Sequence, residues 1–94
     1  MTLDEVKAAF RQLPYARLVE FREGNSPDSF RLLTATHSYH ITCRDDYLGC
    51  IASSRKPREG ETWTRGNDLP YGPADENTLA EIVQAMLGYE LSAA

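Results

Sequence analysis

The chain has 94 residues, of which 41% are hydrophobic and 26% charged, and a formal net charge of −4; these values are typical of one soluble globular domain, which we place at 1–94. No apolar run approaches the roughly 20 residues of a membrane-spanning helix, and the start, MTLDEVKAAF, is acidic and amphipathic, unlike a secretory signal. We therefore expect a cytoplasmic protein with no membrane association. The net negative charge argues against a protein whose whole surface binds nucleic acid.

A first helix is predicted at the start of the chain. Thr2 and, three residues later, Glu5 fit a capping box, in which each side chain satisfies a free backbone N–H at the helix start. Apolar residues then recur at spacings of three and four, which gives the helix one apolar face: Leu3, Val6, Ala9, Phe10 and Leu13. Pro14 ends the helix at Leu13, because proline lacks an N–H and disfavours helical geometry in the residue before it.

The middle of the chain predicts an antiparallel sheet. The expected strands are 15–23, 29–36, about 38–44 and 47–54. A turn at Asp45-Asp46 pairs the last two, and period two then places six residues on one apolar face: Tyr39, Ile41, Cys43, Leu48, Cys50 and Ala52. The other face is mixed, with His40, Thr42, Arg44 and Tyr47. The break around Thr36-His37-Ser38 is poorly marked, so residues 29–44 form either one bent strand or two.

A second helix is predicted from about 75 to 91. Asp75 or Asn77 can cap it, and its apolar stripe is Leu79, Ile82, Val83, Met86 and Leu87. A meander with one apolar face and two amphipathic helices is best satisfied when both helices cover that face. We therefore predict an α+β fold: an antiparallel β-meander of three to four strands, with the N- and C-terminal helices packed on one face as a two-layer sandwich.

The long segment between the sheet and the second helix is the main functional candidate, a loop at 54–74. The run SSRKPREGETWTRGNDLPYGP (53–73) has no apolar periodicity and contains the only tryptophan. Residues 53–66 hold four cations and two anions, a net of +2, on a remainder with six cations and twelve anions, a net of −6. Loops longer than roughly 12–15 residues are usually functional or disordered, and an aromatic anchor among charges argues against plain disorder.

The side chains of this loop suit an anionic ligand or a stacked base. Guanidinium groups bind phosphate and carboxylate bidentately, and an indole offers a stacking surface, which Tyr39, Tyr47 and Tyr71 would extend. The candidate binding residues are Arg55, Lys56, Arg58, Trp63, Arg65, Asn67 and Asp68. The structural alternative is that Trp63 folds back to plug the core, with Gly66-Asn67-Asp68 as a turn and Arg65 and Asn67 satisfying backbone groups. The sequence leaves both versions open.

Metal binding and catalysis have weaker support. The spacing His37-x2-His40-x2-Cys43-x6-Cys50 suggests zinc, but strand alternation sends His40 to the face opposite His37 and Cys43, so we expect no metal or other cofactor. Cys43 and Cys50 would be diagonal, a poor geometry for a disulfide. A hydrolase would combine Ser53 or Ser54, His37 or His40, and Asp68, without the G-x-S-x-G elbow.

A carboxylate pair for glycoside hydrolysis could come from Glu59, Glu61 and Asp68, but these side chains are more simply solvated or paired with arginines. An enzyme of small molecules would need a concave pocket that holds His37, or a loop carboxylate with a perturbed pKa.

A resemblance adds context. The stretch from Ala52 to Pro73, with SSRKPR at 53–58, Gly60-Glu61, WTRGNDL at 63–69 and Gly72-Pro73, resembles small uncharacterised bacterial proteins associated with phages and mobile elements. It extends over about 47–91. The resemblance implies an accessory role and no catalytic residue.

We therefore predict a non-enzymatic binding domain that engages a macromolecular partner through the 53–71 loop and the exposed sheet edge. Arginine and aromatic residues are the usual interface hot spots, and the acidic remainder favours a protein partner. The alternative is binding of single-stranded nucleic acid by the same loop, and the third hypothesis is a small-molecule enzyme. An unpaired meander edge leaves the oligomeric state open.

Overall fold

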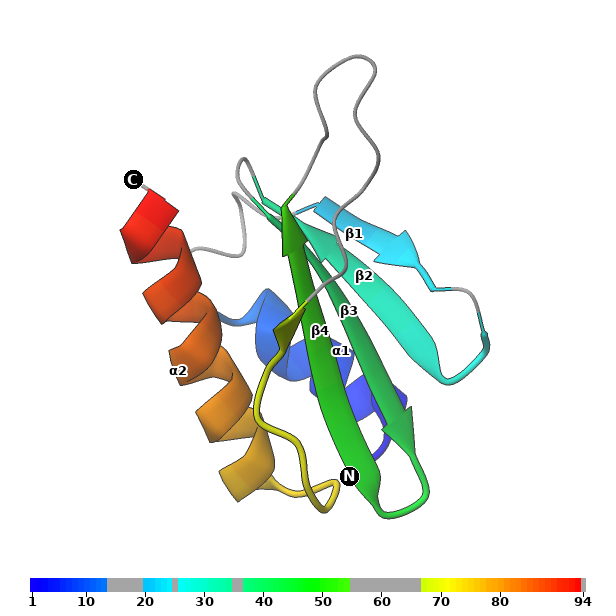
Figure 1. Ribbon diagram of the computed structural model, residues 1–94. Helices are drawn as coiled ribbons and strands as arrows, with labels where there is room; N and C mark the ends of the chain where they lie inside the picture. The colour runs from blue at the N-terminus through cyan, green and yellow to red at the C-terminus, as the bar shows by residue number, and fades with distance from the viewer. Residues whose placement is uncertain (14–19, 25, 35–36, 55–66, 94) are drawn as a thin grey trace.

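The structure is a computed structural model that describes residues 1–13, 20–24, 26–34, 37–54 and 67–93 (Figure 1). The helices and strands are α1 (Leu3–Arg11), β1 (Glu20–Glu23), β2 (Ser29–Leu33), β3 (His37–Arg44), β4 (Tyr47–Ser54), β5 (Asn67–Asp68) and α2 (Glu76–Ala93). The predicted α+β fold is confirmed.

The strands form one antiparallel sheet in the order β1-β2-β3-β4-β5, so each strand pairs with its neighbour in sequence. The hairpin between β3 and β4 has the predicted register, with Cys43 opposite Leu48 and Ile41 opposite Cys50. Asp45, in the turn between β3 and β4, has a positive φ of 39°, which residues other than glycine adopt only rarely. Residues 29–44 form two strands, because the N–H of Thr34 donates to the carbonyl of His37 (2.9 Å) and reverses the chain.

Both helices cover the same face of the sheet, as predicted. In Figure 1 α1 lies behind the sheet and α2 runs beside β4 and β5. The core joins Val6 and Phe10 of α1 and Ile82 and Met86 of α2 to the apolar face of the strands. That face is buried throughout: Phe30, Leu32, Tyr39, Ile41, Cys43, Leu48, Cys50 and Ala52. We call the opposite face, which no helix covers among the described residues, the helix-free face.

The helix caps follow the sequence. The Thr2 hydroxyl accepts a hydrogen bond from the N–H of Glu5 (3.2 Å), and Asp75 Oδ1 accepts one from the N–H of Thr78 (2.9 Å). The apolar stripe of α2 is narrower than predicted. Leu87 is 39% exposed and lines an open hollow together with Ala9 of α1.

The segment after residue 66 differs from the predicted loop. A turn at Gly66-Asn67-Asp68 is wrong for its described part, since Asn67–Asp68 is strand β5, paired with Ala52 and Ile51. The pairing continues beyond β5, where Leu48 and Gly72 exchange two backbone hydrogen bonds (2.8 and 3.1 Å). The edge of β4 is therefore covered by the chain itself.

Candidate functional site

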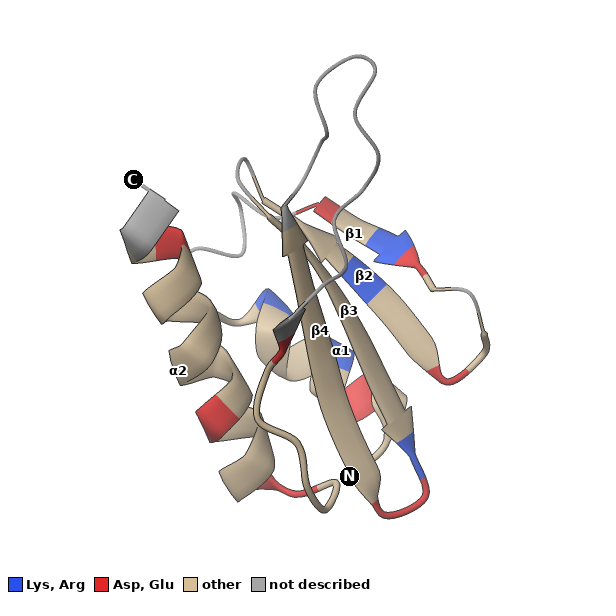
Figure 2. Cartoon of the chain, in the orientation of Figure 1, with Lys and Arg blue, Asp and Glu red and all other residues tan. Residues whose placement is uncertain are grey.

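One residue from each strand forms a row across the helix-free face. The pairing sets Arg22 opposite Arg31, Arg31 opposite His40, His40 opposite Ile51, and Ile51 opposite Asp68. Side chains opposite one another share a face, so the row has two arginines at the β1 end and a carboxylate at the β5 end. In Figure 2 β2 has a basic position and the segment at β5 an acidic one, whereas β1 has a basic position between two acidic ones, of which Glu20 pairs with Arg22 (2.8 Å).

A hollow of about 280 Å³ lies at the acidic end of this row. We call it the tyrosine hollow, and the described residues that line it are His40, Thr42, Tyr47, Gly49, Cys50, Ile51, Asp68, Leu69 and Tyr71. The rings of Tyr47 and Tyr71 are 6.3 Å apart between centroids, at an angle of 40°. Tyr47, Ile51 and Tyr71 are 44%, 42% and 69% exposed, which is unusual for large apolar side chains gathered at one place.

Two local features build the tyrosine hollow. A Cβ at position 49 would overlap the hydroxyl end of Tyr47, so the tyrosine ring lies over Gly49 and needs a glycine there. Leu69 is 4% exposed, and its N–H donates to the carbonyl of Cys50 (2.9 Å). This anchor in the core fixes the two residues that flank the hollow, Asp68 and Tyr71.

His40 is the titratable group whose environment is most unusual on this face. Burial lowers the pKa of its imidazole, the Arg31 guanidinium lowers it further, and the Asp28 carboxylate opposes both. Its Nε2 atom is buried and has no hydrogen-bond partner among the described residues. The imidazole is therefore neutral at neutral pH, and Asp68 holds the one formal charge among the described residues of the tyrosine hollow.

The lowered pKa of His40 makes a prediction about stability. The unfolded imidazole has the ordinary pKa of 6.5, so below that pH the unfolded state binds more protons than the folded state, and the free energy of unfolding falls as the pH falls. His40→Gln removes this contribution. We expect the free energy of unfolding of the wild type to fall relative to that of the variant as the pH falls from about 7.5 to about 5. Urea unfolding of both proteins measures this difference. Parallel curves for the two proteins would contradict it.

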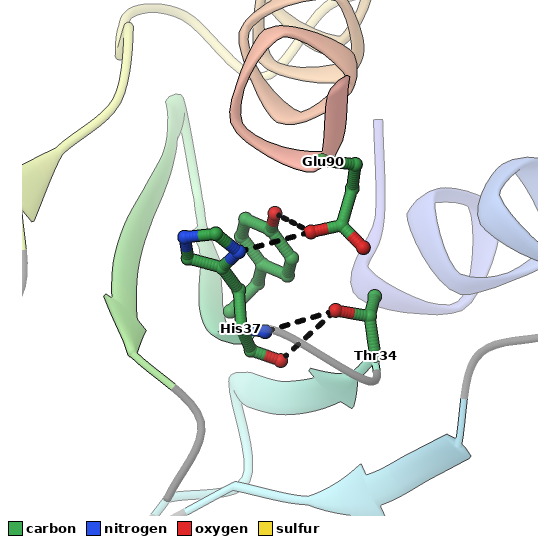
Figure 3. A network of polar contacts seen from close by, with 4 residues as sticks. Thr34, His37 and Glu90 are labelled. Carbon is green, nitrogen blue, oxygen red and sulfur yellow. Dashed lines mark hydrogen bonds and ion pairs between the residues drawn. The ribbon is translucent and has the colours of Figure 1, made fainter. Parts of the chain in front are cut away.

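The other histidine belongs to a polar network on the helix side (Figure 3). Glu90 Oε2 of α2 accepts a hydrogen bond from the hydroxyl of Tyr39 (2.7 Å) and lies 3.1 Å from His37 Nδ1. The backbone of His37 is held in turn by Thr34, whose Oγ1 accepts from the His37 N–H (3.0 Å). The network ties the end of α2 to β3, a structural role.

The arrangement does not assemble the hydrolase that the sequence allowed. His37 points to Glu90 on the helix side, whereas Asp68 is on the helix-free face, so these two cannot act together. Ser53 and Asp68 share a face with His40, but no hydrogen bond joins either of them to its imidazole in the described structure.

The structure also shows where the cysteines and the candidate metal ligands lie. Cys43 and Cys50 are free thiols buried in the core. Burial raises the pKa of both, that of Cys50 to about 12, and Cys43 Sγ donates to the carbonyl of Met1 (3.5 Å). His37 and His40 lie on opposite faces, as predicted from alternation. Within the described ranges no group of three or more histidine, cysteine or acidic residues could hold a metal ion.

The predicted binding residues divide into two groups. Arg55, Lys56, Arg58, Trp63 and Arg65 lie outside the described residues, so their role, and the choice between Trp63 as core plug and as anchor, stay predictions. Asn67 and Asp68 lie on β5, with Asp68 at the tyrosine hollow. Sequence reasoning missed Gly49 and Ile51, although the predicted register already placed both on the face of Tyr47.

No protein-family model matches the chain, and no curated protein or solved structure is significantly similar to it. The fold and the site are therefore interpreted from their own geometry. Among the described residues, neither α1 nor α2 combines the length and the apolar character that crossing a membrane requires.

Proposed function

We propose that this protein is a non-enzymatic binding domain that engages a macromolecular partner, in the first place a protein, through its helix-free face and the adjoining 53–71 segment. The observation that carries this proposal is the cluster of Tyr47, Ile51 and Tyr71, exposed around a hollow on a face without a helix. Tyrosines that are held in place but exposed are the side chains that interfaces use as anchors, since they bury much area at little entropic cost.

The position of the cationic segment supports the same surface. Residues 55–66 connect β4 to β5, and both strands border the tyrosine hollow. Arg55, Lys56, Arg58, Trp63 and Arg65 thus belong to the connection between two strands that both contribute residues to the lining of the hollow. The resemblance of 47–91 to proteins associated with phages and mobile elements favours an accessory role over a metabolic one.

The second candidate is binding of single-stranded nucleic acid by the same surface. Two neighbouring tyrosine rings offer stacking faces, and the segment that joins β4 and β5 supplies four cations. This candidate predicts that the affinity falls steeply as the salt concentration rises, because the binding would depend on contacts with phosphates.

The proposal is tested with a double variant, Tyr47→Ala with Tyr71→Ala, beside the control Leu91→Ala, whose side chain is 76% exposed on α2. Each protein is immobilised and used to capture partners from a lysate of its source organism, with the bound protein quantified. We expect the double variant to lose about tenfold or more of the captured partner, the size typical of two interface anchors, while Leu91→Ala keeps it.

A parallel amide NMR titration with single-stranded oligonucleotides at low and near-physiological salt decides between the candidates. Salt-sensitive shifts at positions 47, 51 and 71 would favour nucleic acid over a protein. Equal capture by the double variant and the wild type, together with no shifts, would show that this face is not a binding surface.

A further inference from the structure

The tyrosine hollow has a chemical character that selects its occupant. Asp68 is the one formally charged side chain among its described lining residues, because the imidazole of His40 is neutral. An anion placed there would meet a carboxylate and, among the described lining residues, no compensating cation. A cation would be attracted by Asp68, and the net charge of −4 of the whole chain points the same way.

The aromatic lining narrows the class of cation. Tyr47 and Tyr71 both line the hollow, with their ring centroids 6.3 Å apart and an angle of 40° between the rings. A cation over a tyrosine ring is attracted by the ring quadrupole, and a planar guanidinium also stacks on such rings and pairs bidentately with a carboxylate. An ammonium group is a strongly hydrated point charge that does neither, so arginine fits better than lysine.

The size of the hollow and the row of charges agree with a side chain as occupant. At about 280 Å³ the hollow is smaller than the roughly 300–1,000 Å³ of pockets that enclose drug-sized ligands. Arg31 lies opposite His40 on the side away from Asp68, so His40 and Ile51 separate the basic residues of the row from its Asp68 end. An N–H that reaches His40 would also give its buried Nε2 a partner.

We propose that the tyrosine hollow binds an arginine side chain of the partner, with the guanidinium stacked on Tyr47 and Tyr71 and paired with Asp68. The inference rests on the proposed function and makes it more specific. The partner is then a protein that presents an exposed arginine on a basic surface.

The test uses small probes of known chemistry: N-acetyl-arginine amide, its lysine counterpart, and N-acetyl-citrulline amide, which has nearly the same shape as the arginine probe but no charge. Each is titrated at millimolar concentration against the labelled full chain and followed by amide NMR. We expect shifts at positions 40, 47, 51, 68 and 71 with the arginine probe, smaller ones with lysine, and almost none with citrulline.

The matched variants are Asp68→Asn and, as a control, Asp46→Asn, at another exposed carboxylate in the turn between β3 and β4. Asp68→Asn should weaken binding of the arginine probe about fivefold, the size of one partly exposed charge-assisted contact, whereas Asp46→Asn leaves it unchanged. Both positions are exposed, so both variants are expected to give the amide spectrum of a folded protein.

Equal shifts with arginine and citrulline, no shifts with either, or an unchanged affinity in Asp68→Asn would each overturn the inference. Its failure is distinguishable from failure of the proposed function. If partner capture is lost in the double tyrosine variant but unchanged in Asp68→Asn, the surface binds a partner by another chemistry than an arginine.

Discussion

Replacing Leu69 by alanine is expected to lower the free energy of unfolding by about 2–5 kcal/mol, the range for a buried leucine in a well-packed core. Leu69 is 4% exposed although it directly follows the charged Asp68, and its N–H donates a hydrogen bond to the carbonyl of Cys50 in β4. The loss combines the transfer free energy of the side chain with the cavity that it leaves. Urea unfolding measures it, with Leu91→Ala as a surface control expected to change stability by about 0.5 kcal/mol at most.

The same variant should also affect the site. Asp68 and Tyr71 lie on either side of Leu69 and line the tyrosine hollow, so loosening this anchor is expected to release both. The amide and ring signals of Tyr71 would then move toward the values of a mobile chain, even in the folded fraction. A stability change below about 1 kcal/mol, with Tyr71 signals as in the wild type, would show that Leu69 does not anchor the segment.

The largest loss is expected from Phe30→Ala, about 3–5 kcal/mol. Phe30 is 1% exposed and is the centre of an aromatic cluster: its ring meets Phe10 edge-on (centroids 6.1 Å apart, 69°) and stacks with Phe21 (6.3 Å, 15°). Alanine removes both contacts, and the cluster that joins α1 to β1 and β2 collapses only in part. Thermal and urea unfolding give the value.

Phe30→Leu is the control for this position, because it retains most of the apolar volume; we expect it to cost about 1–2 kcal/mol. The aromatic cluster is on the helix side, so at temperatures where Phe30→Ala is still folded its affinity for the partner should equal that of the wild type. A leucine variant as stable as the wild type would show that the ring contacts contribute little.

The hairpin of β3 and β4 was predictable because two independent signals agree there. The turn formers Asp45 and Asp46 fix where the chain reverses, and alternation on each side then leaves one register in which an apolar face meets an apolar face. The first helix was predictable for a similar reason, since the cap and the apolar period mark its start and its face; it ends at Arg11, two residues before the end that Pro14 predicted.

Strand β5 could not be predicted in this way. Asn67 and Asp68 belong to residue types that are depleted in strands, and two residues have no readable period. They are extended because the edge of β4 offers unpaired backbone groups and the burial of Leu69 holds the segment against it. Such a strand comes from tertiary contacts, which a local pattern does not contain.

The candidate site was predicted in composition but not in place. The sequence singled out Asp68, Tyr47 and Tyr71 as neighbours of the loop, but its inclusion of Tyr39 was wrong, because Tyr39 is buried on the helix side and donates to Glu90. Nothing local indicates that Tyr71 returns to the ring of Tyr47. The hollow also depends on Gly49, over which the ring of Tyr47 lies. The direction of that side chain could not be predicted from the sequence. The residues from 55 to 66 remain a prediction for the same surface.

The burial of the two thiols has a practical consequence. Alkylating reagents and oxidants attack the thiolate, and in the core of this domain the pKa of both cysteines is raised, so little thiolate forms at neutral pH. A cysteine introduced on the helix-free face would therefore react with a fluorophore or spin label while Cys43 and Cys50 stay unmodified. The wild-type chain is in this sense already suited to site-specific labelling, and occupancy of the face could be followed by spectroscopy without first removing its own cysteines.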